Sequence, residues 1–173
     1  MRINVIEADD LPDIFLRAEY REILMSCHYY KKSLNSKSGL NRSSIPQQYT
    51  LNKGHAKFFY DKMLFIQQRH DKLEQEMRIR GFKIRDSYDL KLDWIQEKDM
   101  NPYKVTEQDI LLNLGRVLAK ISLKEDGYYK LSKYPMSLDG WFVFYNDIYK
   151  FPVEVLAEAM KSDRFYIPRK EVA

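Results

Sequence analysis

The sequence predicts an all-α fold: a compact single domain of three main helices, with long loops and an aromatic C-terminal extension. Three stretches carry apolar residues at helical spacing, and segments rich in Ser, Asn, Gly and Pro separate them. A length of 173 residues with 45% hydrophobic side chains suits one domain with a continuous core.

The first helix is predicted over residues 12 to 30. Asp9 or Asp10 suits an N-cap, and Pro12 fits the first turn, where its missing N–H would have no partner in any case. Apolar residues then recur at helical spacing, among them Ile14, Phe15, Ala18 and Met25. We therefore expect an amphipathic helix with one side in the core.

A carboxylate, Glu22, stands at the border of the apolar side of this helix. It follows Phe15 by seven residues and Ala18 by four, and Arg17 and Arg21 form a neighbouring basic row. A boundary glutamate paired with an arginine is the simpler interpretation of this pattern. A carboxylate with a chemical function is the alternative.

A long irregular connection is predicted from Lys32 to Lys53, because Ser, Asn, Gly39 and Pro46 follow one another there. The net charge of +4 is modest, but residues 28 to 57 contain no Asp or Glu. Their basic residues, interleaved with tyrosines, are Lys31, Lys32, Lys37, Arg42, Lys53 and Lys57. Such a stretch suits contact with phosphates and stacking on bases, although a solvated surface loop explains it equally well.

A second helix is predicted over residues 54 to 80, with Gly81 in the C-cap position. A third is predicted over residues 106 to 121, where acidic residues near the start favour a helix N-terminus. On this third helix, Arg116 and Lys120 form an i, i+4 basic pair that can meet phosphates.

The C-terminal part of the chain is aromatic. The run Trp141-Phe142-Val143-Phe144-Tyr145 is compatible with a strand or with a hydrophobic cover over the core. A short helix is predicted from Pro152 to Ser162.

Several classes of protein are disfavoured by the composition. No stretch approaches the roughly 20 apolar residues of a membrane span, and the start lacks the apolar core of a signal peptide, so we expect a soluble cytoplasmic protein. Cys27 is expected to be a small packed residue rather than a catalytic thiol. The histidines and this cysteine show no metal-ligand spacing, and we expect neither a metal nor a cofactor.

The chain begins Met1-Arg2-Ile3-Asn4, and its α-amino group is a potential nucleophile. An α-amine titrates near ~7.7–8.0, well below a lysine near ~10.4, so that a useful fraction is unprotonated at neutral pH. Because Arg2 is long and methionine removal needs a small neighbour, we expect Met1 to persist and to carry the amine. A terminus that is merely frayed or packed is the commoner case.

With these residues in view, the chain resembles the phage pyrimidine-dimer DNA glycosylases, the endonuclease V type that repairs ultraviolet damage. The similarity covers about residues 1 to 134, and the order and spacing of its blocks make it specific. The matching blocks are Arg2-Ile3-Asn4, Ala18-Glu19-Tyr20-Arg21-Glu22, Gly54-His55, Phe58-Phe59-Tyr60-Asp61-Lys62 and Arg80-Gly81-Phe82, with Ile84 and Asp86. Weaker similarity lies at Arg116, Lys120 and Tyr128-Tyr129-Lys130.

The resemblance implies a glycosylase-like helical domain at residues 1 to 134, with residues 135 to 173 as a C-terminal extension packed on it. It further implies that the amine of Met1 attacks the sugar C1′ of the 5′ nucleotide in a pyrimidine dimer. The base leaves, an imine forms, and β-elimination then breaks the strand. Glu22 would be the acid–base or charge-stabilising carboxylate.

The implied partner is double-stranded DNA with damaged or modified pyrimidines, in a bacterial or phage-infected cell. The sequence does not fix the oligomeric state, and a monomer is favoured. The implied DNA contacts are basic or aromatic, at Arg2, Arg21, Arg116, Lys120, Tyr128, Tyr129 and Lys130. A base inside a stacked duplex hides C1′, so such an enzyme must bend the DNA and extrude a nucleotide.

The sequence departs from this family at positions near the implied site. Met1 stands where the family has threonine, Phe15 where it has histidine, Met25 where it has a phosphate-binding arginine, and Tyr128 where it has tryptophan. Two alternatives to a pyrimidine-dimer glycosylase and AP lyase therefore stay open. One is a related glycosylase for another damaged or modified base, and the other is a DNA-bending or DNA-binding protein without catalysis.

Overall fold

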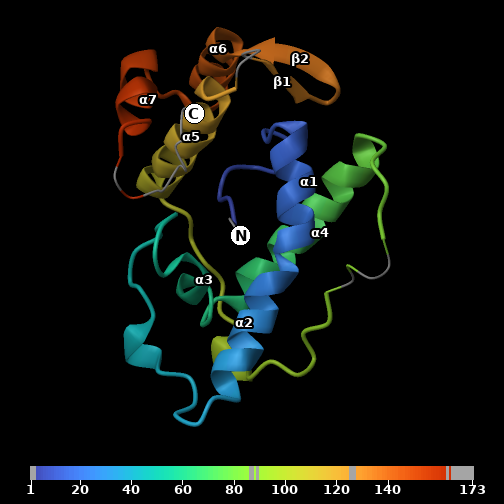
Figure 1. The fold of residues 1–173 in the computed structure, drawn as a ribbon, viewed down its shortest axis with the longest axis vertical. Helices are drawn as coiled ribbons and strands as arrows, with labels where there is room; N and C mark the ends of the chain where they lie inside the picture. Colours follow the sequence, from blue (N-terminus) through green and yellow to red (C-terminus); the bar gives the residue numbers. More distant parts are fainter. Residues whose placement is uncertain (1–2, 86–87, 89, 125–127, 163, 165–173) are drawn as a thin grey trace, which may run out of the picture.

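A computed structural model describes residues 3–85, 88, 90–124, 128–162 and 164 (Figure 1). The α-helices are α1 (Asp13–Glu22), α2 (Leu24–Leu34), α3 (His55–Phe58), α4 (Met63–Ile79), α5 (Glu107–Ser122), α6 (Leu138–Tyr149) and α7 (Val153–Ala159). Arg42–Ser44 and Glu97–Asp99 form short 3-10 helices, and an antiparallel hairpin joins β1 (Tyr128–Leu131) to β2 (Tyr134–Ser137).

The fold is mostly helical, as expected, and a small hairpin is added to it. The predicted number of three main helices is not confirmed, because five helices of ten residues or more lie in the described part of the chain. Helices α1 and α4 pack against each other, and α6 and α7 pack on α5. The N-terminal segment runs between α1 and α5 (Figure 1).

The first predicted helix is divided at Ile23 into α1 and α2. The Ile23 backbone stays right-handed, but its carbonyl accepts both the Ser26 N–H at 3.1 Å and the Ser26 hydroxyl, which tightens the turn locally. The predicted N-cap at Asp9 or Asp10 is wrong. Pro12 occupies that position without a side-chain cap, and the Asp10 carboxylate instead accepts a hydrogen bond from Tyr149.

The second predicted helix is also divided, into α3 and α4, because the chain turns between Phe58 and Met63. The predicted end at Gly81 is confirmed. Gly81 has φ +68°, its N–H donates to the Arg78 carbonyl at 2.9 Å, and the Phe82 N–H donates to the Met77 carbonyl at 2.8 Å. This is a Schellman ending, which favours glycine at the left-handed position.

Helix α5 is the central helix of the molecule. A capping box begins it, in which the Thr106 hydroxyl accepts from the Asp109 N–H at 3.2 Å while the Asp109 carboxylate accepts from the Thr106 N–H at 2.9 Å. Residues 112 to 119 are all buried. The predicted third helix is therefore confirmed, and it is enclosed by other parts of the chain.

The Trp141 run is not a strand, since it belongs to helix α6, which packs on α5. Trp141 and Tyr145 are fully buried, and the Tyr145 hydroxyl donates to the Asp10 carbonyl at 3.1 Å. The predicted short helix near the C-terminus is present as α7, where Leu156 is buried. These contacts join residues beyond 134 to the N-terminal part, while the division at residue 134 stays a prediction.

A helical carboxylate holds the turn of the β1–β2 hairpin. Ser132 and Lys133 both have positive φ, 47° and 74°, which is unfavourable without glycine or asparagine. Their N–H groups donate to the two Asp13 carboxylate oxygens at 2.9 and 2.8 Å, and Arg80 binds the same carboxylate at 2.7 Å. The hairpin is thereby fixed against the start of α1.

Replacement of Gly115 by alanine should destabilise the fold, because a Cβ there would lie 2.4 Å from the Ala159 carbonyl oxygen of α7. We expect Gly115→Ala to lower the free energy of unfolding by about 1–3 kcal/mol, measured by urea denaturation, although alanine favours helix. Gly140→Ala is the matched control in α6, because its Cβ would meet the flexible Met136 side chain. Equal losses in the two variants would contradict tight α5–α7 packing.

Candidate active site

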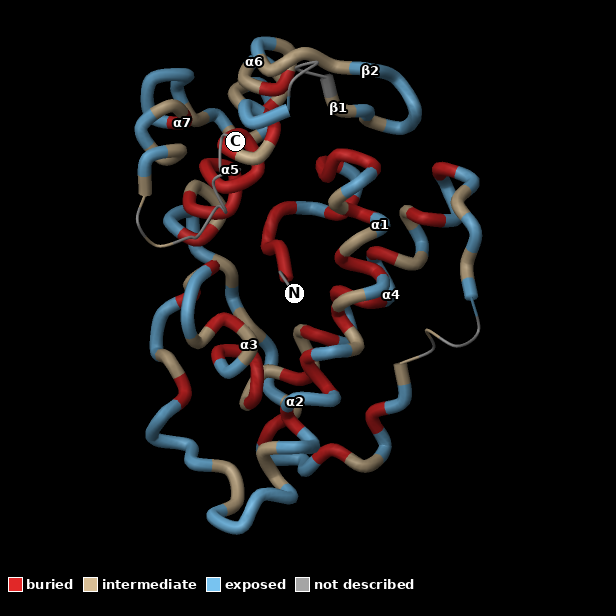
Figure 2. Tube along the Cα trace, viewed as in Figure 1, coloured by how far each residue is buried: buried red, intermediate tan, exposed pale blue. Residues whose placement is uncertain are grey.

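The N-terminal segment Ile3–Ile6 is buried in the middle of the molecule (Figure 2). It is extended but pairs with no strand in the described residues, so its backbone polar groups need other partners. Side chains from α1, α3, α4, α5 and the loop before α3 supply these partners. The position of this segment is therefore set by the packing of the helices around it.

The strongest of these contacts comes from a buried ion pair between Glu19 of α1 and Arg69 of α4, which are 2% and 4% exposed. Two parallel hydrogen bonds, at 2.9 and 3.0 Å, join the guanidinium to the carboxylate. Burial alone lowers the pKa of Arg69, but the Glu19 charge outweighs it and raises that pKa, so Arg69 stays charged.

The same two side chains hold the N-terminal segment. The Glu19 carboxylate accepts the Asn4 backbone N–H at 2.9 Å and the Asn4 side-chain amide at 2.6 Å, while Arg69 donates to the Ile6 carbonyl at 2.6 Å. A buried ion pair is costly unless further hydrogen bonds complete it. Here the peptide groups of the segment complete it.

Helix α5 binds the segment from the opposite side. Asn113 accepts the Val5 N–H at 2.7 Å and donates to the Asn4 side-chain oxygen at 2.8 Å. Arg116, which is 4% exposed, also donates to that oxygen. The Asn4 side chain thus connects α1 to α5 through charge-assisted hydrogen bonds.

Two aromatic side chains fix Ile3, the first described residue. The Ile3 N–H donates to His55 Nε2 at 2.7 Å, and its carbonyl accepts from the buried Tyr49 hydroxyl at 2.8 Å. His55 Nδ1 lies within hydrogen-bonding distance of the Thr50 carbonyl. Since Nε2 must accept while Nδ1 donates, this geometry requires neutral imidazole with the proton on Nδ1.

Glu22 belongs to the same helix as Glu19, which binds the N-terminal segment. It is half-buried on α1, three residues after Glu19, and residues at this spacing lie about 5–6 Å apart on one side of a helix. From Asn4 to Ile3 the chain passes from Glu19 toward His55. Met1 and Arg2 lie outside the described residues, so the distance from the amine to Glu22 stays a prediction.

The other expected DNA contacts lie on α1, α5 and β1. Tyr129 stacks on Phe15 with ring centres 5.5 Å apart, and Arg116 and Lys124 lie over the outer faces of these two rings, 5.8 Å from Phe15 and 5.0 Å from Tyr129. Phe15 is half-buried, so this stack borders the site. Phe15, which stands where histidine was expected, is thus in contact with an aromatic ring and with a guanidinium group.

The remaining expected contacts differ in exposure. Arg21 and Lys130 are exposed and Lys120 is half-buried, whereas Arg116 is buried against the N-terminal segment. Tyr128 belongs to β1, and its side chain lies outside what the structure describes. The structure thus brings Arg116 against the N-terminal segment, while Arg21 and Glu22 lie on α1 and Lys130 lies on the hairpin.

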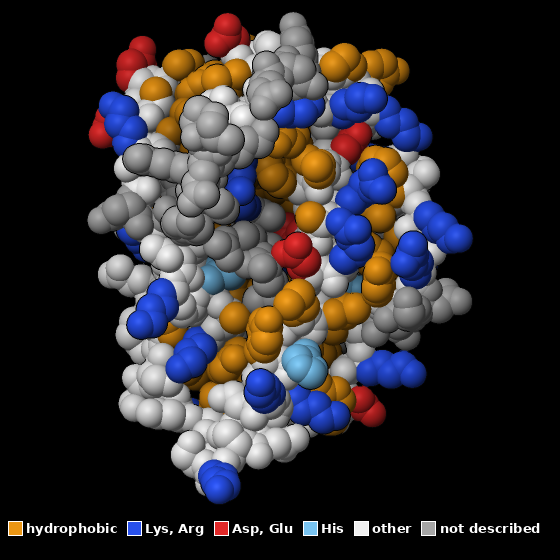
Figure 3. Space-filling model, in the orientation of Figure 1, with side chains coloured by type: hydrophobic (Ala, Val, Ile, Leu, Met, Phe, Trp, Pro, Cys, Tyr) orange, Lys and Arg blue, Asp and Glu red, His pale blue; other side chains and the backbone are white. Residues whose placement is uncertain are grey.

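One face of the molecule is rich in Lys and Arg side chains, which surround a hydrophobic central area (Figure 3). Part of the basic loop predicted from the sequence has a structural role, since Arg42 binds the fully buried Asp99. Tyr30 donates to the same carboxylate. Although burial raises the pKa of Asp99, these hydrogen bonds lower it overall, so the carboxylate stays charged and holds the loop.

Three expectations about other chemistry can be compared with the described residues. No group of three or more His, Cys, Asp or Glu side chains among them could hold a metal ion. Burial raises the pKa of Cys27 to about 11, which disfavours a reactive thiolate. Within that same part of the chain, no helix has the length and apolar character needed to cross a membrane.

A comparison with protein families identifies the family of this chain. The family model described as pyrimidine dimer DNA glycosylase matches residues 1–90. The chain belongs to this family. The expected resemblance is confirmed, and a DNA substrate and a role as a repair glycosylase follow from the membership. The matched region contains Glu19, His55 and Arg69, which hold the N-terminal segment.

Sequence reasoning did not single out the polar residues that hold this segment. Glu19, Arg69 and Asn113 each lie among buried positions of a helix. A polar residue at such a position signals a buried network, because it needs a partner there. That signal could have identified the residues, although not which partners they meet.

Glu19→Gln should destabilise the protein strongly, because it leaves the buried Arg69 charge without its counter-ion. We expect a loss of about 3–5 kcal/mol in the free energy of unfolding, measured by urea denaturation. Glu74→Gln is the matched control, since Glu74 forms an i, i+4 pair with the exposed Arg78 and should cost less than about 0.5 kcal/mol. A loss as small as the control's would mean that the ion pair does not hold the segment.

Proposed function

We propose that this protein removes damaged pyrimidines from double-stranded DNA and then cleaves the strand, with the Met1 amine as nucleophile and Glu22 as its carboxylate. Cyclobutane pyrimidine dimers are the proposed lesion. The supporting observation is the set of buried hydrogen bonds that fix Ile3 and Asn4 beside α1. Two residues span at most about 7 Å, so the amine of Met1 starts within short reach of this anchored point.

In the proposed reaction, the lone pair of the amine attacks C1′ and the bond from C1′ to the base breaks. The electron pair of that bond leaves with the base, which takes up a proton. Glu22 stabilises the positive charge that develops at the sugar and takes the proton that the amine loses. The nitrogen lone pair then forms the double bond to C1′ as the bond from C1′ to O4′ breaks, and O4′ keeps the electron pair of that bond and takes up the proton from Glu22. The product is a protonated imine with an open sugar.

Strand cleavage follows from the imine. Loss of a proton from C2′ expels the 3′ phosphate by β-elimination, and water then hydrolyses the imine and frees the amine. An unprotonated amine is needed only at the first step, so an α-amine serves better than an unperturbed lysine near neutral pH.

Binding of the DNA in this proposal rests on the basic face. Arg2, Arg21, Lys120 and Lys130 contact phosphates, and Tyr128 and Tyr129 lie near the damage. Arg116 is assigned a positioning role, because it is buried against Asn4. Extruding a nucleotide costs a few kcal/mol, and damage that already weakens stacking lowers this cost.

Borohydride trapping tests the proposal directly, because it reduces an imine to a stable protein–DNA crosslink. We expect crosslinks on duplexes with a cyclobutane dimer or an abasic site, and none on intact duplex. Two residues added ahead of Met1 should abolish trapping, whereas the same addition after Ala173 should not. Trapping on abasic DNA without dimer cleavage would assign another base, and duplex binding without any trapping would refute catalysis.

Glu22→Gln should slow base removal at least 100-fold in single-turnover assays at saturating protein, which is the usual range for loss of an acid–base group. Binding of the duplex should change little, because glutamine keeps the size of the side chain and one acceptor oxygen. Glu97→Gln, at an exposed position of the 3-10 helix Glu97–Asp99, is the control for loss of one negative charge. Unchanged turnover in Glu22→Gln would exclude Glu22 from this role.

A further inference from the structure

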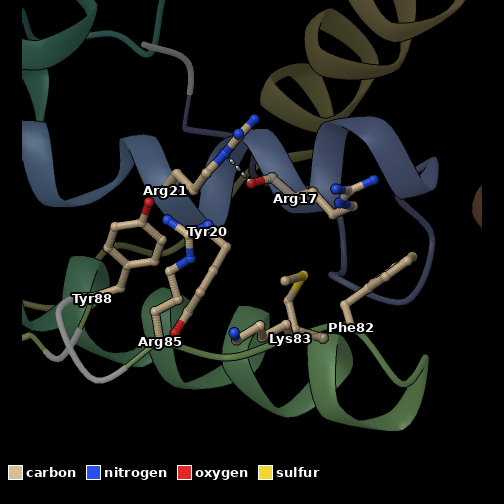
Figure 4. A pocket seen from close by; sticks show the side chains of 8 residues that line it. Arg17, Tyr20, Arg21, Phe82, Lys83, Arg85 and Tyr88 are labelled. Carbon is tan, nitrogen blue, oxygen red and sulfur yellow. Dashed lines mark hydrogen bonds between the residues drawn. The ribbon is translucent and has the colours of Figure 1, made fainter.

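A second basic site lies on the far side of α1 from the N-terminal segment. It is a pocket of about 140 Å³ between α1 and the segment after α4, and Figure 4 shows it from close by. Four cationic side chains line it: Arg17, Arg21, Lys83 and Arg85. Among the residues that the structure describes, no carboxylate lines it.

The cations come from two separate parts of the chain. Arg17 and Arg21 lie one turn apart on α1, and Lys83 and Arg85 follow Gly81, whose left-handed backbone ends α4 and directs the chain back along α1. The fold thus gathers like charges around one space. Like charges repel at this range, so the arrangement favours an anion that would sit between them.

Aromatic rings hold two of the guanidinium groups in place. Arg17 lies over the Phe82 ring at 5.3 Å, and Arg85 lies over the Tyr88 ring at 5.8 Å. The Arg21 Nε donates to the Arg17 carbonyl at 3.1 Å. These contacts orient the arginines without neutralising them, because a ring face and a carbonyl carry no net charge.

One acidic side chain near the pocket, Glu74, already forms an ion pair with another residue. Glu74 of α4 acts on the buried Tyr20 at the pocket wall, but its carboxylate binds Arg78 at 2.6 Å. None of the four pocket cations forms an ion pair with a carboxylate in the described part of the chain. Among the described residues, no carboxylate therefore neutralises the positive charge of the pocket.

We propose that this pocket binds a phosphodiester group of the DNA backbone, with Arg17, Lys83 and Arg85 as the residues that hold it beside Arg21. The inference rests on the proposed function, since it takes DNA as the ligand. Arg21 lines this pocket and is also a phosphate contact in the proposed function, so it connects the pocket to the DNA path that we propose at Glu22. Guanidinium groups bind phosphate oxygens in pairs, which suits the two arginines added here.

The test compares two variants that lose the same charge. The pocket variant carries Arg17→Gln, Lys83→Gln and Arg85→Gln, and the control carries Lys98→Gln, Lys150→Gln and Lys161→Gln, all at exposed positions. Binding of an undamaged duplex is measured by fluorescence anisotropy from 50 to 200 mM salt. We expect the pocket variant to show a log–log salt slope shallower than the control's by about 0.9, the effect of one lost phosphate contact, and roughly tenfold weaker binding at the lowest salt.

Equal slopes and affinities in the two variants would overturn the proposal. Lys83→Gln alone, at an exposed position, should shift the slope in the same direction and serves if the triple variant unfolds. Melting temperatures measured with and without inorganic phosphate show whether the pocket binds free phosphate or the phosphate of the DNA backbone. If phosphate stabilises the wild type while both triple variants bind DNA alike, the pocket serves a free phosphate and the DNA assignment is wrong.

These outcomes are independent of imine chemistry. Undamaged duplex is not a substrate, so its binding and salt slope can be measured whether or not the protein forms a crosslink. Wild type that binds with the expected slope but is never trapped would refute the proposed catalysis and leave the pocket assignment standing. Wild type that is trapped normally, with equal slopes in both triple variants, would refute only the pocket.

Discussion

The structure depends above all on the buried ion pair between Glu19 and Arg69. Neither charge would be stable alone in the core, and together they still need further hydrogen bonds, which Asn4 and the Ile6 carbonyl provide. An extended segment can therefore lie at the centre of a helical protein without a neighbouring strand. The beginning of the chain becomes part of the core because the core needs its peptide groups.

This constraint connects the C-terminal helices to the site. Helices α6 and α7 pack on α5, the helix that carries Asn113 and Arg116. Tyr149 of α6 donates one hydrogen bond to the Asp10 carboxylate and accepts another from the Glu7 N–H. Burial raises the pKa of Asp10, and burial with the nearby carboxyl raises that of Tyr149, which stays the donor. Helix α6 thus fixes the residues that follow the N-terminal segment.

Local signals predicted the parts of the fold that local chemistry decides. The Thr106 capping box and the Gly81 ending are such signals, and the start of α5 and the end of α4 lie where the sequence placed them. The division of the first helix at Ile23 depends on one serine side chain that bonds back to the backbone. The hairpin turn at Ser132 and Lys133 lacks the residues that such turns favour, because Asp13, far away in sequence, stabilises it. No local pattern could have shown the support of this turn by Asp13.

The site was predictable to a similar degree. Glu22 was singled out by its place beside an apolar helix side and by the resemblance, and the structure places it one turn from Glu19. The role of Asn4 as a bridge between α1 and α5 was not predictable, since the hydrogen bonds of this one residue join positions more than a hundred residues apart. Arg116 illustrates the limit of sequence reasoning. Helical spacing showed that it pairs with Lys120 as a basic side chain, but it could not show that Arg116 is buried.

The positive face has its origin in how the fold uses its carboxylates. A net charge of +4 gives little reason to expect a polyanionic ligand. Glu19 and Asp13, however, are buried and bind arginines that are buried as well, and the buried Asp99 binds Arg42, so these carboxylates contribute little to the field outside. Exposed cations such as Arg17 and Arg21 then act on the solvent without internal compensation. Because buried pairs are screened from salt and exposed cations are not, the interior stays stable while contact with DNA remains adjustable by ionic strength.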